Sequence, residues 1–238
     1  MFEVKGPSGA FADFALSATL EELYQALLAR YGRQHWWPAD DPFEVIVGAI
    51  LTQSTAWTNV EKAISNLKGV GALSPQALRM LSLDELALLI RPSGYYRVKA
   101  LRLKSFASFL GDGYGDSLEA LFSLDVGVLR GELLSVYGIG PETADSIVLY
   151  AAEKPVFVID AYTRRIVSRL GLASGDEAYG RLQALFMANL PCREGLYNEY
   201  HALLVRHGKE VCRKTPRCGG CLVAYLCHFG GIGTGSGC

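Results

Sequence analysis

Helix-start signals recur along the 238-residue sequence, whereas strand-like sequence is almost absent, and this contrast constrains the fold more than any other feature. Thr19 with Glu22 and Ser82 with Glu85 have the spacing of capping boxes, and the apolar residues that follow them recur with helical spacing. Only 155–159 (PVFVI) is strand-like, and five residues without a partner cannot build a sheet, so we interpret it as a buried extended linker. The sequence therefore predicts an all-α protein with helices over 20–31, 43–53, 56–68, 75–81, 83–91, 97–110, 117–122, 126–136, 141–152, 161–170, 176–189 and 194–208.

No segment of the sequence is suited to crossing a membrane. The longest uncharged internal stretch, 45–60, is interrupted by polar side chains and is shorter than the roughly 20 apolar residues that a span needs. The first residues lack the basic start and continuous apolar run of a secretory signal, which predicts a cytoplasmic protein, associated with the nucleoid in a prokaryote. Disulfides are not expected in that reducing compartment, and a monomer is the expected oligomeric state.

The net charge is close to zero, because 23 basic residues are balanced by 24 acidic ones, and this excludes binding to nucleic acid through bulk positive charge. Two windows, 95–106 and 206–217, are nevertheless basic. Such a stripe is suited to phosphate contacts, although the solvated face of a helix would have the same pattern. The basic residues of the two windows are Arg97, Lys99, Arg102, Lys104, Arg206, Lys209, Arg213, Lys214 and Arg217.

Four of the six cysteines fall within sixteen residues, with the spacing C-x5-C-x2-C-x5-C. Thiolates packed so closely repel one another unless a cation shares them, and four sulfurs are suited to one zinc ion or one iron–sulfur cube. A single short C-x2-C pair with two outlying cysteines favours a [4Fe–4S] cluster, with zinc as the alternative. The predicted ligands are Cys212, Cys218, Cys221 and Cys227, whereas Cys192 and Cys238 are expected to be a packed thiol and a tail thiol.

A glycine hairpin, Tyr137-Gly138-Ile139-Gly140, lies between two apolar helical segments. Glycines two residues apart permit a tight turn, and the N–H groups at the start of the second helix are suited to a phosphate oxygen. About twenty residues later Asp160 ends the apolar linker and precedes the next predicted helix. An aspartate at that place is typical of a helix N-cap.

The order of hairpin, aspartate and cysteine loop, from about residue 42 to 228, resembles the endonuclease III-like branch of the helix-hairpin-helix (HhH-GPD) DNA glycosylases. LTQSTAWTNVEKA is similar to the glutamine-bearing loop of that family, SGYYRVKALRLK to its second DNA-facing turn, and HALLVRHGKEVCRKTPRCGGCLVAYLC to its cluster loop. The first cysteine spacing is x5 where the family usually has x6.

The resemblance implies two α-helical domains with a cleft between them and an iron–sulfur loop near the C-terminus. An N-terminal helix in 1–41 would join 154–228 to form the cluster domain. A six-helix barrel carrying the helix-hairpin-helix would occupy 42–153, and 229–238 would be a disordered tail.

The resemblance also implies roles for individual residues. Asp160 would be the catalytic carboxylate, which stabilises positive charge on the sugar and orients the attacking water. Bifunctional relatives have a lysine where this chain has Glu142, so lyase chemistry through an imine is not expected. Lys154 is about 12 residues further along and is not expected to replace it. The remaining implied DNA contacts are Gln53, which would fill the gap in the duplex or else cap a helix, backbone N–H groups of Gly138, Ile139 and Gly140, and phosphate contacts from Lys99, Arg213, Lys214 and Arg217.

All three tryptophans are close in sequence, Trp36 and Trp37 in HWWP and Trp57 after the LTQ loop. They can fill a core or form a stacking clamp around an extruded base, and electron-rich indoles attract a cationic ring. Together with Glu142, these segments resemble the 3-methyladenine DNA glycosylase III subgroup, which implies a base pocket at Trp37 and Trp57, to which we add Trp36.

The predicted function is therefore monofunctional base excision repair: a DNA glycosylase that hydrolyses the N-glycosidic bond of a flipped, damaged base in double-stranded DNA. The expected base is an alkylated purine such as 3-methyladenine. The alternatives are a glycosylase for uracil or thymine mismatches or oxidised bases, and a non-catalytic, cluster-bearing DNA-binding protein. Retention of Asp160 favours an enzyme.

Overall fold

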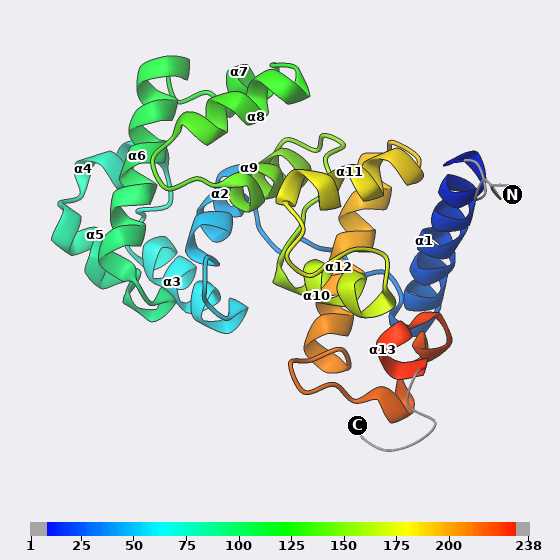
Figure 1. Ribbon diagram of the computed structural model, residues 1–238. Helices are drawn as coiled ribbons and strands as arrows, with labels where there is room; N and C mark the ends of the chain where they lie inside the picture. The colour runs from blue at the N-terminus through cyan, green and yellow to red at the C-terminus, as the bar shows by residue number, and fades with distance from the viewer. Residues whose placement is uncertain (1–8, 232–238) are drawn as a thin grey trace, which may run out of the picture. The chain divides into compact units, whose positions relative to one another are not determined.

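The computed structural model describes residues 9–231, and every regular element in that range is helical, as predicted (Figure 1). The chain divides into two compact units. Unit 1 comprises Met1–Trp36 and Phe157–Cys238, and unit 2 is the intervening Trp37–Val156. The unit boundaries lie at 36/37 and 156/157, where the sequence predicts them at 41/42 and 153/154.

Unit 1 is built on the packing of α1 against α11 and α12, and of α10 against α12 and α13. Its centre is an aromatic core in which Phe157 stacks on Phe186 at 4.0 Å between ring centroids, with Tyr200 edge-on to both rings. These three side chains are completely buried. The elements of unit 1 are α1 (Gly9–Tyr31), α10 (Ala161–Leu170), α11 (Tyr179–Asn189), α12 (Glu194–Glu210), η3 (Cys218–Gly220), η4 (Ala224–Leu226) and α13 (His228–Gly231).

Helix α1 starts earlier than the sequence predicts. Thr19 lies within the helix, where its hydroxyl donates to the carbonyl of Ala15 at 2.9 Å, so the predicted capping box at Thr19 is wrong. The apolar residues Leu20, Leu23 and Leu27 are completely buried, as their spacing indicates. The helix ends at Tyr31 as expected, because Gly32 adopts φ +66°, a conformation that favours glycine.

Unit 2 is organised around α2 and α6. Helix α6 contacts α2, α4, α5 and α7, and α2 also contacts α3 and the π-helical turn η2. The capping box of Ser82 with Glu85 is present in both directions, at 3.2 and 2.8 Å. The elements of unit 2 are α2 (Pro42–Leu51), α3 (Trp57–Gly69), α4 (Pro75–Met80), α5 (Leu83–Leu89), η1 (Arg91–Ser93), α6 (Tyr96–Tyr114), α7 (Leu118–Phe122), α8 (Val126–Ser135), α9 (Pro141–Ser146) and η2 (Ile147–Ala151).

The hairpin helices α8 and α9 are joined by a buried ion pair. The Nε atom of Arg130 lies 2.6 Å from Oδ1 of Asp145, and the Asp145 side chain is completely buried. A charge in such a place is costly unless it is paired, so the pair holds the two helices in one relative position.

The segment 156–159 is extended and buried without strand pairing, which confirms the prediction of a buried linker. Residues 229–231 belong to α13, which shortens the predicted tail, and the rest of that tail lies outside the described residues. In the described part of the chain, none of the helices combines the length and apolar character needed to cross a bilayer.

Candidate functional site

The glycine hairpin of unit 2 connects α8 to α9. Gly138 adopts φ +82°, and the side chain of Arg102 packs so close that a Cβ atom at Gly138 would overlap it. The N–H of Ile139 donates to the carbonyl of Val136 at 3.1 Å, and its side chain is buried. Within the described residues the N–H groups of Gly138 and Gly140 have no hydrogen-bond partner. The two glycine N–H groups are therefore available to an anion, whereas the predicted contact from Ile139 N–H is wrong because that donor is used in the turn.

Gln53 is tied to the hairpin. Its Nε2 atom donates to the carbonyl of Gly138 at 3.0 Å and to the hydroxyl of Thr143 at 2.8 Å, while Arg102 donates to its Oε1 atom. The side chain is only half-buried. Gln53 thus links the loop after α2 to the hairpin, and it would have to leave these partners in order to enter a gap in a DNA duplex.

Lys99 does not lie where a phosphate could reach it, so its predicted DNA contact is wrong. The side chain is 1% exposed, and Nζ donates to the carbonyls of Leu51 at 2.8 Å and Ser93 at 2.6 Å. Ser93 also accepts a bond from the Thr55 hydroxyl at 2.6 Å. Lys99 therefore connects the end of α2 to the turn before α6, which are the two segments that resemble the family's DNA-facing loops.

The buried position of Lys99 predicts a specific pH dependence of stability. Burial, with a smaller effect of the Arg102 charge, lowers the pKa of Lys99 from 10.5 to about 8. Between these values the unfolded state binds more protons than the folded state, so the contribution of Lys99 to the free energy of unfolding rises with pH, by at most about 1.4 kcal/mol per pH unit. Urea denaturation from about pH 8 to about pH 10 should show this rise in the wild type relative to Lys99→Met.

Lys104→Met is the matched control, because Lys104 lies on the same helix and also donates to backbone carbonyls but is half-exposed. A stability difference between wild type and Lys99→Met that stays constant over this pH range would contradict the placement of Lys99.

Tyr95 is a residue that sequence reasoning missed. It precedes α6 with φ +45°, which is unfavourable for a bulky side chain, and it is 74% exposed. Strained backbone and an exposed aromatic ring occur together at functional loops, and this turn resembles the family's second DNA-facing segment. The only signal in the sequence was the resemblance of SGYY itself.

Three aromatic residues of unit 2 form one group. The ring centroid of Trp37 lies 5.1 Å from that of Trp57, edge to face, and 5.3 Å from that of Tyr150. Gly48 lies directly beneath the Trp37 ring, where a Cβ atom would come within 3.1 Å of it. The sequence did not predict a role for Tyr150. This residue lies in η2, a π-helical turn, and such turns are frequent at functional sites.

The third predicted tryptophan, Trp36, belongs to unit 1, where the Lys209 ammonium lies 5.9 Å from its ring centroid. The structure therefore brings together Trp37 and Trp57 in unit 2, and the assignment of Trp36 to the base pocket stays a prediction. Trp37 and Trp57 touch edge to face, so they do not form an open slot between parallel rings. A base can stack on an outer ring face of this pair.

Glu142 is exposed in the first turn of α9, immediately after the hairpin. This is the position at which the resemblance places the lysine of bifunctional relatives, and here the side chain is a carboxylate. Lys154 lies beyond the end of η2, and its N–H donates to the carbonyl of Val148 at 3.0 Å.

Asp160 of unit 1 is the N-cap of α10. Its Oδ1 atom accepts from the N–H of Thr163 at 2.7 Å, and its Oδ2 atom lies 3.8 Å from Nε2 of His201, beyond hydrogen-bond distance. The side chain is 12% exposed. One carboxylate oxygen thus fixes the orientation of the group, and the second is left for chemistry, so the capping and catalytic interpretations are compatible.

His201 is a third residue that sequence reasoning missed, since a lone histidine in a helix carries no local signal. It lies on α12 and is buried. Burial lowers its pKa, and the nearby Asp160 carboxylate partly opposes that change. A neutral imidazole beside Asp160 leaves the carboxylate charge uncompensated, which suits a group that stabilises developing positive charge.

The four clustered cysteines line one pocket of unit 1, together with apolar side chains such as Ile166 and Val223. The guanidinium of Arg169 donates to Sγ of Cys212 at 3.3 Å, and Sγ of Cys227 donates to the Arg169 carbonyl at 3.2 Å. Within the described residues, no three ligand side chains surround a single metal-ion position. The four sulfurs therefore share one pocket.

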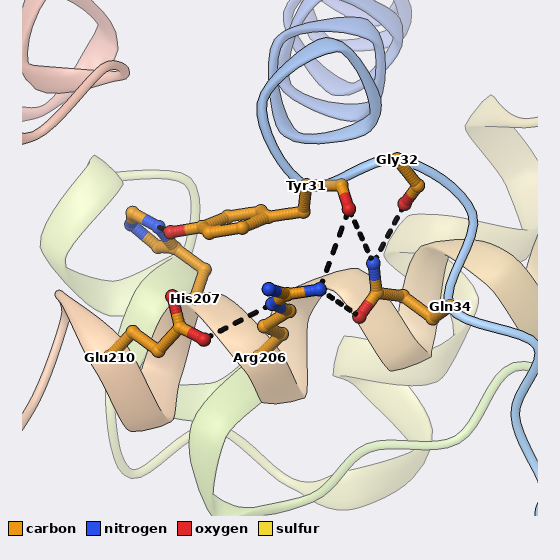
Figure 2. A network of polar contacts seen from close by, with 6 residues as sticks. All are labelled: Tyr31, Gly32, Gln34, Arg206, His207 and Glu210. Atoms are coloured by element: carbon orange, nitrogen blue, oxygen red, sulfur yellow. Dashed lines mark hydrogen bonds and ion pairs between the residues drawn. The ribbon is translucent and has the colours of Figure 1, made fainter.

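His207 forms another wall of this pocket. Its Nε2 atom lies 3.8 Å from Sγ of Cys221, and its Nδ1 atom lies 3.1 Å from the Tyr31 hydroxyl. Burial lowers the pKa of His207 to about 4, so it is neutral at neutral pH. Figure 2 shows the contacts of Arg206 in this region. Arg206 donates to the carbonyl of Tyr31 and to Oε1 of Gln34, and it forms an ion pair with Glu210. These contacts hold the end of α1 against α12.

Of the other predicted residues, Arg213, Lys214 and Arg217 are exposed on the cysteine loop, as phosphate contacts require. Cys192 is exposed, so the prediction that it is a packed thiol is wrong. Cys238 lies outside the described residues.

The chain is similar over most of its length to known DNA repair proteins. Residues 47–192 match the sequence profile of the HhH-GPD superfamily of base excision DNA repair proteins. A Methanocaldococcus jannaschii protein described as a candidate DNA repair glycosylase is 47% identical over 207 residues, which cover 87% of this chain and 94% of that protein. Endonuclease III of Thermotoga maritima is 32% identical over 218 residues, which cover 88% of this chain and 92% of the enzyme.

A solved structure of H. pylori 3-methyladenine DNA glycosylase bound to 1,N6-ethenoadenine superimposes with a TM-score of 0.68 and 29% identity. The match covers 83% of this chain and 97% of that enzyme.

Proposed function

The chain belongs to the HhH-GPD superfamily of base excision DNA repair proteins, as an endonuclease III-like DNA glycosylase, and from this premise we propose its substrate and reaction. The enzyme removes an alkylated purine such as 3-methyladenine from double-stranded DNA by hydrolysis, without lyase activity. The observation that carries the proposal is the aromatic group of Trp37, Trp57 and Tyr150 in unit 2.

This aromatic group is suited to a cationic base. The indole N–H of Trp57 donates to the carboxylate of Glu61 at 2.9 Å, so a negative charge lies at the edge of the ring system. Electron-rich rings attract cations through their faces, and alkylated purines carry a positive charge that normal bases lack. The similarity to a 3-methyladenine glycosylase, at 29% identity, supports the same substrate class.

Asp160 supplies the chemistry at the sugar. A cationic base already has a weakened glycosidic bond and needs little acid assistance, so the enzyme must mainly stabilise the oxocarbenium character that develops at C1′. The Oδ2 atom of Asp160, which is not used in capping α10, is proposed to do this and to orient the attacking water.

Glu142 supports hydrolysis without strand cleavage. An amine is needed to attack the sugar and form an imine, and the exposed side chain at the start of α9 is a carboxylate. The abasic strand is therefore proposed to remain intact after base release.

We assign a [4Fe–4S] cluster to Cys212, Cys218, Cys221 and Cys227. The donor set fits this group, because four thiols, the ligands that such a cluster takes, line one pocket. When bound, the cluster would supply positive charge that the four thiolates share, and these cysteines would then hold together the loop that carries Arg213, Lys214 and Arg217. We also propose that the protein is a cytoplasmic monomer, as expected from the sequence. Light scattering on the purified protein will measure its molar mass and so test the oligomeric state.

A panel of duplexes tests the substrate. Single-turnover release should be fastest for 3-methyladenine, and strands should break only after alkali treatment. Trp57→Ala should slow release about 30-fold, because a desolvated cation–π contact contributes about 2 kcal/mol. Trp57→Phe keeps a ring and should recover most of the rate. Faster release of uracil, thymine or an oxidised base would overturn the substrate, and strand breakage before alkali would overturn the monofunctional assignment.

A further inference from the structure

A groove runs along one face of α10 in unit 1, with a volume of about 330 Å³. The helix residues that line it recur at intervals of three and four, which places them on one side of the helix. Gly175, in the loop after the helix, forms the opposite edge. The lining residues are Ala161, Arg164, Arg165, Ser168, Arg169 and Gly175.

Three of these residues are arginines, and their hydrogen bonds go largely to neutral carbonyl oxygens. Arg165 donates to the carbonyls of Gly208 and Cys212, at 3.0 and 2.8 Å. Arg169 donates to those of Arg213 and Lys214, at 2.7 and 2.9 Å. Arg169 also donates to Sγ of Cys212, at 3.3 Å. Carbonyl acceptors orient a guanidinium but do not cancel its charge, so Arg164 and Arg165 keep theirs.

Arg164 is held at the open edge of the groove. Its Nη1 atom donates to the carbonyl of Gly175 at 3.3 Å and to that of Glu177. In the described part of the chain these are the hydrogen bonds of Arg164, and both use the Nη1 atom. The N–H groups on Nε and Nη2 are therefore available to a ligand in the groove.

Two acidic residues lie in the same loop. The Ser174 hydroxyl and, more weakly, the Arg164 charge lower the pKa of Asp176. The Glu177 carboxylate lies 3.7 Å from Arg181, which is on α11 and is 80% exposed. The loop at the edge of the groove thus carries two acids, which the three arginines outnumber.

We propose that this groove binds a phosphate of the DNA backbone. The proposal rests on the proposed function, since it extends the DNA-binding surface. Planar guanidinium groups fixed by backbone anchors match phosphate oxygens, and little ordering cost remains on binding. Arg169 also anchors the carbonyls of Arg213 and Lys214, so the groove is continuous with exposed cations of the cysteine loop. A chain of almost zero net charge needs such local sites to hold a polyanion.

The test is the salt dependence of binding to undamaged duplex DNA. Its outcome does not depend on base release or on the identity of the damaged base. Arg164→Met should lower the slope of log Kd against log salt by about 0.9, the value for one lost phosphate contact, and weaken binding about tenfold at low salt. Arg164→Lys should restore most of the slope. Arg181→Met is the matched control, because Arg181 is an exposed arginine outside the groove, and its slope should equal that of the wild type.

A second variant covers the case in which Arg164→Met disturbs the loop that it holds, which thermal melting will reveal. Ser168→Asp adds a negative charge to the groove and leaves the arginine anchors in place, so it should also lower affinity and slope. An unchanged slope in both variants, or an equal change in Arg181→Met, would overturn the proposal. Inorganic phosphate is the probe for a small-molecule site: if it binds the groove while Arg164→Met leaves the duplex slope unchanged, the groove is not a DNA contact.

Discussion

Replacing Asp160 by asparagine should reduce single-turnover base release by at least about 100- to 1,000-fold and leave duplex binding nearly unchanged. The magnitude is that of removing one electrostatic stabiliser of a transition state. Asparagine is as good an N-cap as aspartate, so the bond from the Thr163 N–H and the start of α10 should be retained. The variant therefore removes the charge and keeps the geometry.

Asp41→Asn is the matched control for this experiment. Asp41 is also a helix N-cap, and its carboxylate accepts from the Glu44 N–H at 2.9 Å, but it lies in unit 2. Release by this variant should stay within about twofold of the wild type. Equal turnover by Asp160→Asn and the wild type would contradict the catalytic assignment, and the fold would then have to serve DNA binding alone.

Replacing Cys218 by serine should remove the metal and markedly destabilise the C-terminal loop. Anaerobically purified wild-type protein should be brown and contain about four irons per chain, and the variant should contain far less. A ligand group that binds only the folded state contributes its binding free energy to stability, so the apparent free energy of unfolding should fall by several kcal/mol. Iron analysis, visible absorption and urea denaturation measure the three effects.

Cys192→Ser is the matched control, because Cys192 is an exposed thiol outside the pocket. It should retain the iron and the stability of the wild type. A colourless wild-type protein with one zinc per chain would contradict the assignment, and so would full iron content in Cys218→Ser.

The local features of the site could be predicted from the sequence because neighbours in the chain create them. The capping box at Ser82, the stop of α1 at Gly32, the hairpin at Gly138 and the N-cap at Asp160 each depend on a few consecutive residues. The four cysteines likewise lie within one short loop, so their spacing alone indicated a shared pocket.

Other predictions were wrong because distant residues determine the environment of a side chain. A basic window predicts an exposed Lys99, but carbonyls of Leu51 and Ser93 surround its ammonium.

Chain order and residue type were sufficient to establish the helical class, the hairpin, the aspartate at a helix start and the thiol-lined loop, since hydrogen bonds and torsional preferences act over a few residues. Burial and contacts between distant segments determined which side chains lie together in each site. Tyr150 joins Trp37, His201 lies beside Asp160, and three arginines form one groove on α10 because packing brings together segments that the sequence keeps apart. Packing energy depends on the surface that these segments cover together, and no single segment contains that information.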